Sequence, residues 1–135
     1  MEWCKDGFVL TDDKSRIDMD ALYAMLSGSY WASKRSKKIV EKSLAGSLCL
    51  SLFTESAQIG FVRVITDYAV FAWICDVIVN EEYRGLGLGK WMMACMMKHP
   101  DLQQLKMALA TKDAHGLYEQ YGFVRKEFMV REQQL

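Results

Sequence analysis

The chain is poor in proline, in long apolar runs and in any excess of charge of one sign. It has one proline among 135 residues, and 51% of its residues are hydrophobic. A disordered, proline-rich chain is therefore excluded, and we expect one domain, residues 1–135, with a sizeable core. Its 17 basic and 17 acidic side chains cancel, which gives no electrostatic reason to expect a nucleic-acid or membrane partner. No apolar run approaches the ~18 residues that span a membrane.

Cysteine pairs at metal-binding spacing are also missing. The four cysteines, Cys4, Cys49, Cys75 and Cys95, lie far apart in the sequence, whereas zinc sites typically use closely spaced pairs. The N-terminal stretch has no charged-then-apolar layout typical of an export signal, and disulfides are rare in the cytosol. We therefore expect free thiols, no metal site and a soluble cytoplasmic protein.

The hydrophobic pattern changes along the chain from helical to alternating periods and back. Three consecutive strands predict an antiparallel meander, and the later strand–helix–strand step predicts a parallel pair. The sequence thus predicts an α/β fold, with a mixed sheet and helices on both faces. In chain order, the expected elements are strand 8–10, helix 18–26, helix 36–44, strands 48–53, 59–65 and 68–79, a helix from the glycines to Pro100, strand 106–110, helix 113–121 and strand 123–130.

The stretch EEYRGLGLGKWMM joins the longest strand to a helix. It carries Gly85, Gly87 and Gly89 between Arg84 and Lys90. The start of a helix exposes free backbone N–H groups and a partial positive charge, which suits an anion. Glycines let the backbone approach a phosphate closely and adopt positive φ. The sequence predicts a phosphate or pyrophosphate site here, although a tight turn for strand–helix packing explains the glycines alone.

Two familiar phosphate loops do not fit this stretch. The P-loop pattern would need glycine at Arg84 and serine or threonine at Trp91. The dinucleotide fingerprint would need its last glycine at Lys90 or Met92. An ordinary ATPase or NAD enzyme is therefore disfavoured, and a P-loop nucleotide kinase is only a weak third hypothesis.

Two motifs in order resemble the GNAT family of N-acetyltransferases. Arg84-x-x-Gly87-x-Gly89, directly after the apolar strand 76–79, is similar to the acetyl-CoA loop of that family. Downstream, AHGLYEQYGF at 114–123 is similar to the family pattern A-x-x-L-Y-x-x-x-G-F. The likeness covers Gln58 to Phe123 well and is looser over the first 50 residues. It implies a GNAT-like acyl-CoA N-acyltransferase fold that uses acetyl-CoA as the acetyl donor.

The resemblance also implies where coenzyme A would lie. Amides of the loop would cradle the pyrophosphate, and the backbone of the preceding strand would pair with the pantetheine arm where the sheet splays. One departure concerns Thr111, since this position is often asparagine in the family and commonly orders the following helix. The implied cofactor-binding residues are Val77, Ile78, Val79, Arg84, Gly85, Leu86, Gly87, Leu88, Gly89 and Lys90.

The resemblance implies that Tyr118 protonates the leaving thiolate and that the amide region of Val79 serves the oxyanion. Periodicity alone favours a buried aromatic on an amphipathic helix for Tyr118, and the motif favours the proton donor. The base is open: Asp76 could activate the amine or hold a loop, and His115 shares a helix face with Tyr118. Some family members use only a water chain.

Tyr30 and Trp31 lie in the segment that borders the acceptor site in the family, although they could simply cover the edge of the core.

The sequence therefore predicts an acetyl-CoA-dependent N-acetyltransferase that acts by direct transfer in a ternary complex. The expected acceptor is a primary amine of a small molecule or a peptide, and the protein is expected to be a monomer or a homodimer. The alternative is a non-catalytic acyl-CoA binding module, such as a sensor or partner subunit. Such a module would keep Arg84 to Lys90 but would need neither Tyr118 nor a base.

Overall fold

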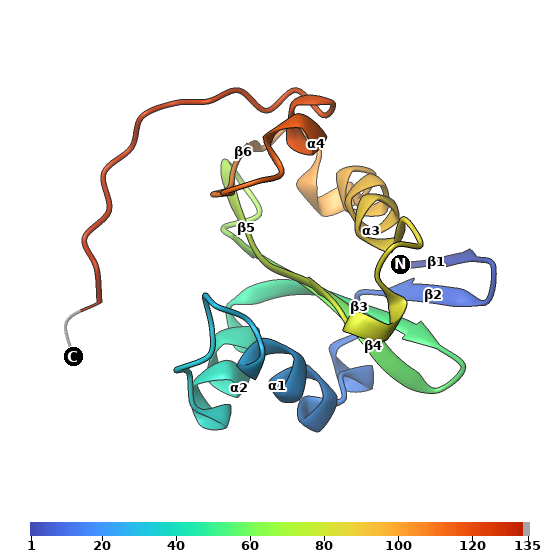
Figure 1. Cartoon of the computed structure of the whole chain (residues 1–135). Coiled ribbons are helices and arrows are strands. Elements are labelled where there is room, and N and C mark those ends of the chain that lie inside the picture. The colour runs from blue at the N-terminus through green and yellow to red at the C-terminus, as the bar shows by residue number, and fades with distance from the viewer. Residues whose placement is uncertain (134–135) are drawn as a thin grey trace.

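One curled sheet of six strands runs through residues 1–133, which the computed structural model describes (Figure 1). The strands neighbour one another in chain order; β1 to β5 are antiparallel, and β5 pairs with β6 in parallel. The predicted mixed sheet, meander and parallel step are confirmed. The strands are β1 (Glu2–Lys5), β2 (Phe8–Thr11), β3 (Ser47–Thr54), β4 (Ala57–Thr66), β5 (Phe71–Val79) and β6 (Lys106–Ala108).

Helices α1 (Met19–Ser27) and α2 (Lys37–Ala45) cover one face of the sheet (Figure 1). Both begin at a capping side chain, since Asp18 accepts a hydrogen bond from the Ala21 N–H and Ser36 accepts one from the Ile39 N–H. Both helices match the sequence prediction to within a residue or two. Their apolar stripes bury Leu22, Leu26, Val40 and Leu44 against Cys49, Phe61 and Ile78 of the sheet.

Helices α3 (Leu88–Met97) and α4 (His115–Glu119) lie on the other face. The methionines of α3 are core residues, as Met92, Met93 and Met96 are no more than 1% exposed. They pack with Leu50, Val62 and other strand residues in the larger of the two hydrophobic clusters. Helices on both faces are thus confirmed. Three short 3-10 turns complete the described elements: Lys14–Arg16, Glu81–Tyr83 and Pro100–Leu102.

The sheet opens between β5 and β6. The two strands pair only over Phe71–Trp73 and Lys106–Ala108, whereas β5 continues to Val79. A register shift in the pairing of β4 with β5 places a bulge in β5, where Asp76 has a φ of 52°. Bulges bend a strand and increase its twist. The bulge therefore accompanies the divergence that leaves the second half of β5 without a neighbour on one side.

Several predicted boundaries are wrong by a few residues. Strand β5 begins at Phe71 rather than Tyr68, because Asp67 accepts hydrogen bonds from three following amides and closes a turn. The α3 helix ends at Met97, and Pro100 begins a 3-10 turn instead of ending the helix. Strand β6 and helix α4 are shorter than predicted.

Two strand predictions at the ends of the chain differ more. Strand β1 was not predicted; it pairs with β2 through a hairpin turn at Asp6 and Gly7, both at positive φ. The predicted last strand, 123–130, is wrong, because residues 123–133 form no helix or strand.

Within residues 1–133, no helix has the length and apolar character needed to cross a membrane.

Candidate active site

The glycine loop joins the end of β5 to the start of α3. Gly85 and Gly87 have φ values of 84° and 76°, a region that residues with a Cβ rarely adopt. A Cβ built on Gly85, Gly87 or Gly89 would meet nothing within 4 Å. These glycines therefore serve the backbone path and leave open space in front of it, and they do not make room for close packing inside the protein.

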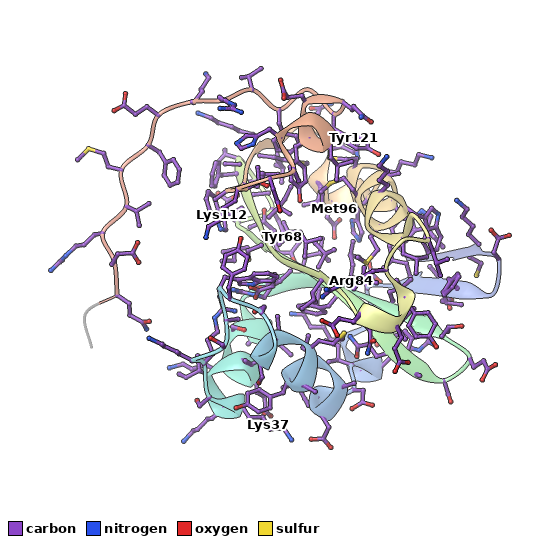
Figure 2. All side chains as sticks on the ribbon, viewed as in Figure 1. Lys37, Tyr68, Arg84, Met96, Lys112 and Tyr121 are labelled. Carbon is purple, nitrogen blue, oxygen red and sulfur yellow. The ribbon has the colours of Figure 1, made fainter. Side chains whose placement is uncertain are left out.

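The N-terminus of α3 faces a hollow suited to an anion. Gly87 is the capping residue and offers no side-chain hydrogen bond, so the first amides of α3 have no side-chain acceptor at the cap. A cavity of about 480 Å³ lies against this end, lined by Arg84, Lys90, the glycines and Leu117 of α4. Figure 2 shows Arg84 at this junction, where its Nε donates to the Val79 carbonyl at 3.1 Å. Two cations and a helix start favour a phosphate here.

The backbone of Val79 points away from β4. The Asn80 N–H donates to the Ile59 carbonyl at 2.7 Å, and Gly60 stands opposite Val79. This bond pattern makes Gly60 and Val79 a non-hydrogen-bonded pair, whose amide groups face outward from the pair. The Val79 N–H therefore faces the side where β5 has no neighbouring strand. A backbone amide that pairs with no strand is free to bind another acceptor, and an extended ligand in the opening between β5 and β6 would supply one.

Asp76 is the centre of a buried ion-pair network. Its carboxylate accepts hydrogen bonds from Arg63 Nε at 2.8 Å, from Arg35 at 2.9 and 3.0 Å and from Trp31 Nε1 at 3.1 Å. Burial alone would raise the pKa of Asp76, but the bonds from Arg63 and Arg35 and their charges lower it. Arg63 also donates to Ser47. This geometry ties the segment that carries Trp31 and Arg35 to the sheet.

The partners of Asp76 were not predicted from the sequence. Arg63 lies in an otherwise apolar stretch of β4 and is only 9% exposed. A buried arginine requires a carboxylate partner. An arginine at position 63 within an apolar strand therefore indicated a buried ion pair. Arg35 gave no such signal, because it lies in a basic segment that resembles a solvated surface.

Tyr118 and His115 come from one face of α4 and line the same cavity, of about 930 Å³, beside β6. Tyr118 is half-buried, and burial, followed by the charge of Asp113, raises the pKa of its phenol. Its ring makes an edge contact with Phe123. The tyrosine therefore keeps its proton at neutral pH, as a proton donor must.

Thr111 orders the start of α4. Its hydroxyl accepts a hydrogen bond from the Ala114 N–H at 3.0 Å. This bond closes the turn before His115, the first residue of the helix. Threonine thus provides the local hydrogen bond that positions the helix carrying Tyr118.

Tyr30 and Trp31 lie in the segment between α1 and α2 and are partly open to solvent. Tyr30 is 69% and Trp31 40% exposed, and their rings meet edge to face. The Lys112 ammonium lies 4.3 Å from the Tyr30 ring centroid, a favourable cation–π geometry. The contact brings the segment after α1 against the segment before α4.

The sequence and the fold of this chain are both similar to those of known acetyltransferases. Residues 45–125 match the family model of the acetyltransferase (GNAT) domain. A crystal structure from Xanthomonas campestris, of a protein assigned to the GNAT family of acetyltransferases, superposes with a TM-score of 0.88. The two proteins are 39% identical, and the match covers 93% of each chain.

More distant relatives share the fold. The uncharacterized N-acetyltransferase ycf52 of Pyropia yezoensis is 26% identical over 128 residues, which cover 87% of this chain and 71% of the relative. A GNAT family acetyltransferase from Elizabethkingia anophelis, crystallised with acetyl-CoA bound, superposes with a TM-score of 0.69 at 16% identity. That match covers 91% of this chain and 80% of the other.

Proposed function

Because this chain belongs to the GNAT family of acetyltransferases, we propose that it transfers an acetyl group from acetyl-CoA directly to a primary amine. One observation carries this proposal: the open, glycine-lined N-terminus of α3 lies next to the end of β5, which has no neighbouring strand on one side. Gly87 begins α3 without a side-chain cap, and Val79 directs its amide into the opening beside it. We infer a small-molecule or peptide amine as the acceptor, bound together with the donor in a ternary complex.

The residues present fit coenzyme A. The first amides of α3, with Arg84 and Lys90, would hold the pyrophosphate, since the space before Gly85, Gly87 and Gly89 is open. The outward-facing backbone of Val77 and Val79 would pair with the pantetheine arm, whereas Ile78 pairs with Phe61 of β4 and its side chain is buried. Leu86, 61% exposed, and Leu88 complete the loop.

Acetyl-CoA supplies an activated thioester carbonyl when it is bound. The Val79 N–H, which faces the opening, would donate a hydrogen bond to the oxygen that becomes negative during attack. Tyr118 would donate its phenolic proton to the departing sulfur, because its raised pKa keeps it protonated. Val79 lines the hollow at the glycine loop, and Tyr118 lines the cavity beside β6. Leu117, next to Tyr118 on α4, lines the first hollow, and we propose that the acetyl group is held between Val79 and Tyr118.

Asp76 is assigned a positioning role rather than that of the base. A carboxylate held by two guanidinium groups and an indole has a lowered pKa and few free acceptor positions. It holds the segment with Tyr30 and Trp31, which we propose contact the acceptor. His115, which lines the same cavity as Tyr118, is the remaining side-chain candidate for the base, and a water chain is the alternative.

The proposed activity is tested by following free-thiol release from acetyl-CoA with a panel of small amines and amino-terminal peptides. The proposal predicts thiol release that depends on the amine and on the enzyme, with an acetylated amine as product. If the protein binds acetyl-CoA but acetylates no amine in the panel, the non-catalytic binding module becomes the better account.

Replacing Tyr118 by phenylalanine should reduce kcat by about 10²–10⁴-fold, the usual contribution of a positioned acid. Acetyl-CoA affinity should change little, because only the hydroxyl is removed. Steady-state kinetics and calorimetry measure the two quantities separately. Tyr121→Phe is the matched control, since Tyr121 lines the same cavity one turn further on and should retain the parental kcat. An unchanged kcat in Tyr118→Phe would exclude the proton-donor role.

A further inference from the structure

The last described segment, residues 123–133, leaves the body of the protein as an extended arm (Figure 1). We call it the C-terminal arm. It forms no strand pairing with the rest of the described chain. Yet four of its apolar side chains, which lie among charged ones in the sequence, are open to solvent: Val124 is 71%, Phe128 58%, Met129 96% and Val130 61% exposed. The residue types are those of a strand, but an extended segment with such exposure gains little from its own protein.

Strand β6 presents the complementary feature. It is the last strand of the sheet over residues 1–133, so one of its edges has no neighbouring strand. The Lys106 N–H donates to the Val70 carbonyl of the segment leading into β5. Because successive residues of a strand direct their amides to opposite sides, the Met107 backbone faces the open edge. Open edges readily add a strand from another chain.

The arm stands away from this edge rather than lying on it. A cavity of about 930 Å³ separates them, lined by Lys106–Ala108 on one side and by 123–128 on the other. Among the ring contacts, the arm touches the sheet through Phe128, whose ring centroid lies 5.9 Å from that of Trp73. Figure 2 shows the arm's side chains projecting on both sides of its backbone.

The exit direction of the arm is set by α4. Gly122 donates to the Glu119 carbonyl and Phe123 donates to the Tyr118 carbonyl, at 3.1 and 3.3 Å. Gly122 has a φ of 87°, which turns the chain after the helix. The Phe123 ring then packs against Tyr118. These contacts fix the chain up to Phe123 and direct the following residues away from the protein's own β6.

We propose that two copies of this chain exchange their C-terminal arms, so that the arm of each copy pairs with the open edge of β6 in the other. Every copy carries both an unpaired arm and an unpaired β6 edge. A single two-fold axis relates the two arm–β6 pairings, so the dimer is closed and leaves neither feature free. The same cavity is also lined by His115 and Tyr118. The exchanged arm of one copy therefore borders the candidate active site of the other.

The test is the solution mass of the full chain by light scattering after size exclusion, over a wide concentration range. The proposal predicts twice the chain mass of 15.5 kDa. The double variant Phe128→Asp with Val130→Asp should give the single-chain mass, with a circular dichroism spectrum that still shows a folded protein and loses only the strand signal of the arm. Ile39→Asp is the matched control, because Ile39 is also an exposed apolar residue (50%) but lies on α2; it should remain dimeric.

Hydrogen exchange separates this proposal from an arm that folds back on its own chain. In the dimer, the Met107 amide and alternate amides of residues 124–130 should be protected, and the double variant should lose that protection. A chain that is monomeric at all concentrations contradicts the proposal, whether its arm amides are protected or not. A dimer that survives the double substitution contradicts it as well, because the interface then lies elsewhere.

Discussion

Gly87→Val should lower the affinity for acetyl-CoA by at least about 100-fold. Two effects act together. The residue has a φ of 76°, where a β-branched side chain costs about 1–3 kcal/mol. The open space before Gly87, in which a Cβ meets no protein atom within 4 Å, is also where the pyrophosphate is proposed to lie. Each tenfold increase in Kd corresponds to about 1.4 kcal/mol of lost binding free energy. A steric clash with the pyrophosphate can easily cost twice that amount, so a 100-fold loss is a modest expectation. Calorimetric titration with acetyl-CoA measures it.

Gly7→Val is the matched control for backbone strain. Gly7 has a φ of 83° in the turn between β1 and β2, and a Cβ there also meets nothing within 4 Å. Both variants should lose a similar amount of thermal stability, but Gly7→Val should keep its affinity for acetyl-CoA. Retained affinity in Gly87→Val, or an equal loss in Gly7→Val, would show that the loop does not hold the cofactor.

Asp76→Ala should destabilise the protein by about 3–5 kcal/mol, the usual cost of removing one partner from a buried ion pair. The side chain of Asp76 is 2% exposed, and its loss leaves Arg63, with 11% side-chain exposure, without its carboxylate. Urea denaturation measures the change. Asp20→Ala is the control: Asp20 pairs with Lys37 at the surface, and exposed pairs contribute far less. A loss in Asp76→Ala no larger than the loss in Asp20→Ala would contradict the account.

The pH dependence of stability follows from the same carboxylate. The pKa of Asp76 in the folded protein lies below its ordinary value of 3.8. Its contribution is therefore complete above the unfolded pKa and is lost as the pH falls through the folded pKa. The acid limb of the stability curve should become shallower in Asp76→Ala. The variant should also raise the KM for the acceptor more than it lowers kcat, because Trp31 and Arg35 lose their anchor.

Local patterns in the sequence predicted most of the fold because the relevant interactions are local. Asp18 and Ser36 cap the helices that they were expected to begin, and the alternation of Leu48 to Phe53 lies within β3. Strand β1 was missed, although the pair Asp6-Gly7 is a strong hairpin sequence and forms the turn with positive φ at both residues. That signal was present in the sequence and was not used.

The remaining differences depend on tertiary contacts. The network of Asp76 joins residues 41 and 45 positions apart in sequence, and no local pattern indicates such a contact. The C-terminal arm has the composition of a strand, but a strand requires a neighbour, and the described part of one chain provides none. Exchange with a second copy, as proposed above, would supply that neighbour.

The glycine loop was placed correctly between a strand and a helix, with Gly87 at the helix start. Its positive φ values follow from the glycines themselves. The outward direction of the Val79 amide could not be predicted, because it depends on the register of β5 against β4. Likewise, the contact between Tyr30 and Lys112 joins segments that are far apart in sequence, so it depends on the tertiary fold and could not be predicted from local patterns.

The most direct test of the account is calorimetric titration of the unmodified protein with acetyl-CoA, beside ATP and NAD. The account predicts binding of acetyl-CoA with a Kd on the order of micromolar, in the usual range for enzyme substrates, and no measurable binding of ATP or NAD. Absence of acetyl-CoA binding would contradict the central claim, because the glycines at 85, 87 and 89 would then shape a loop that holds no coenzyme A.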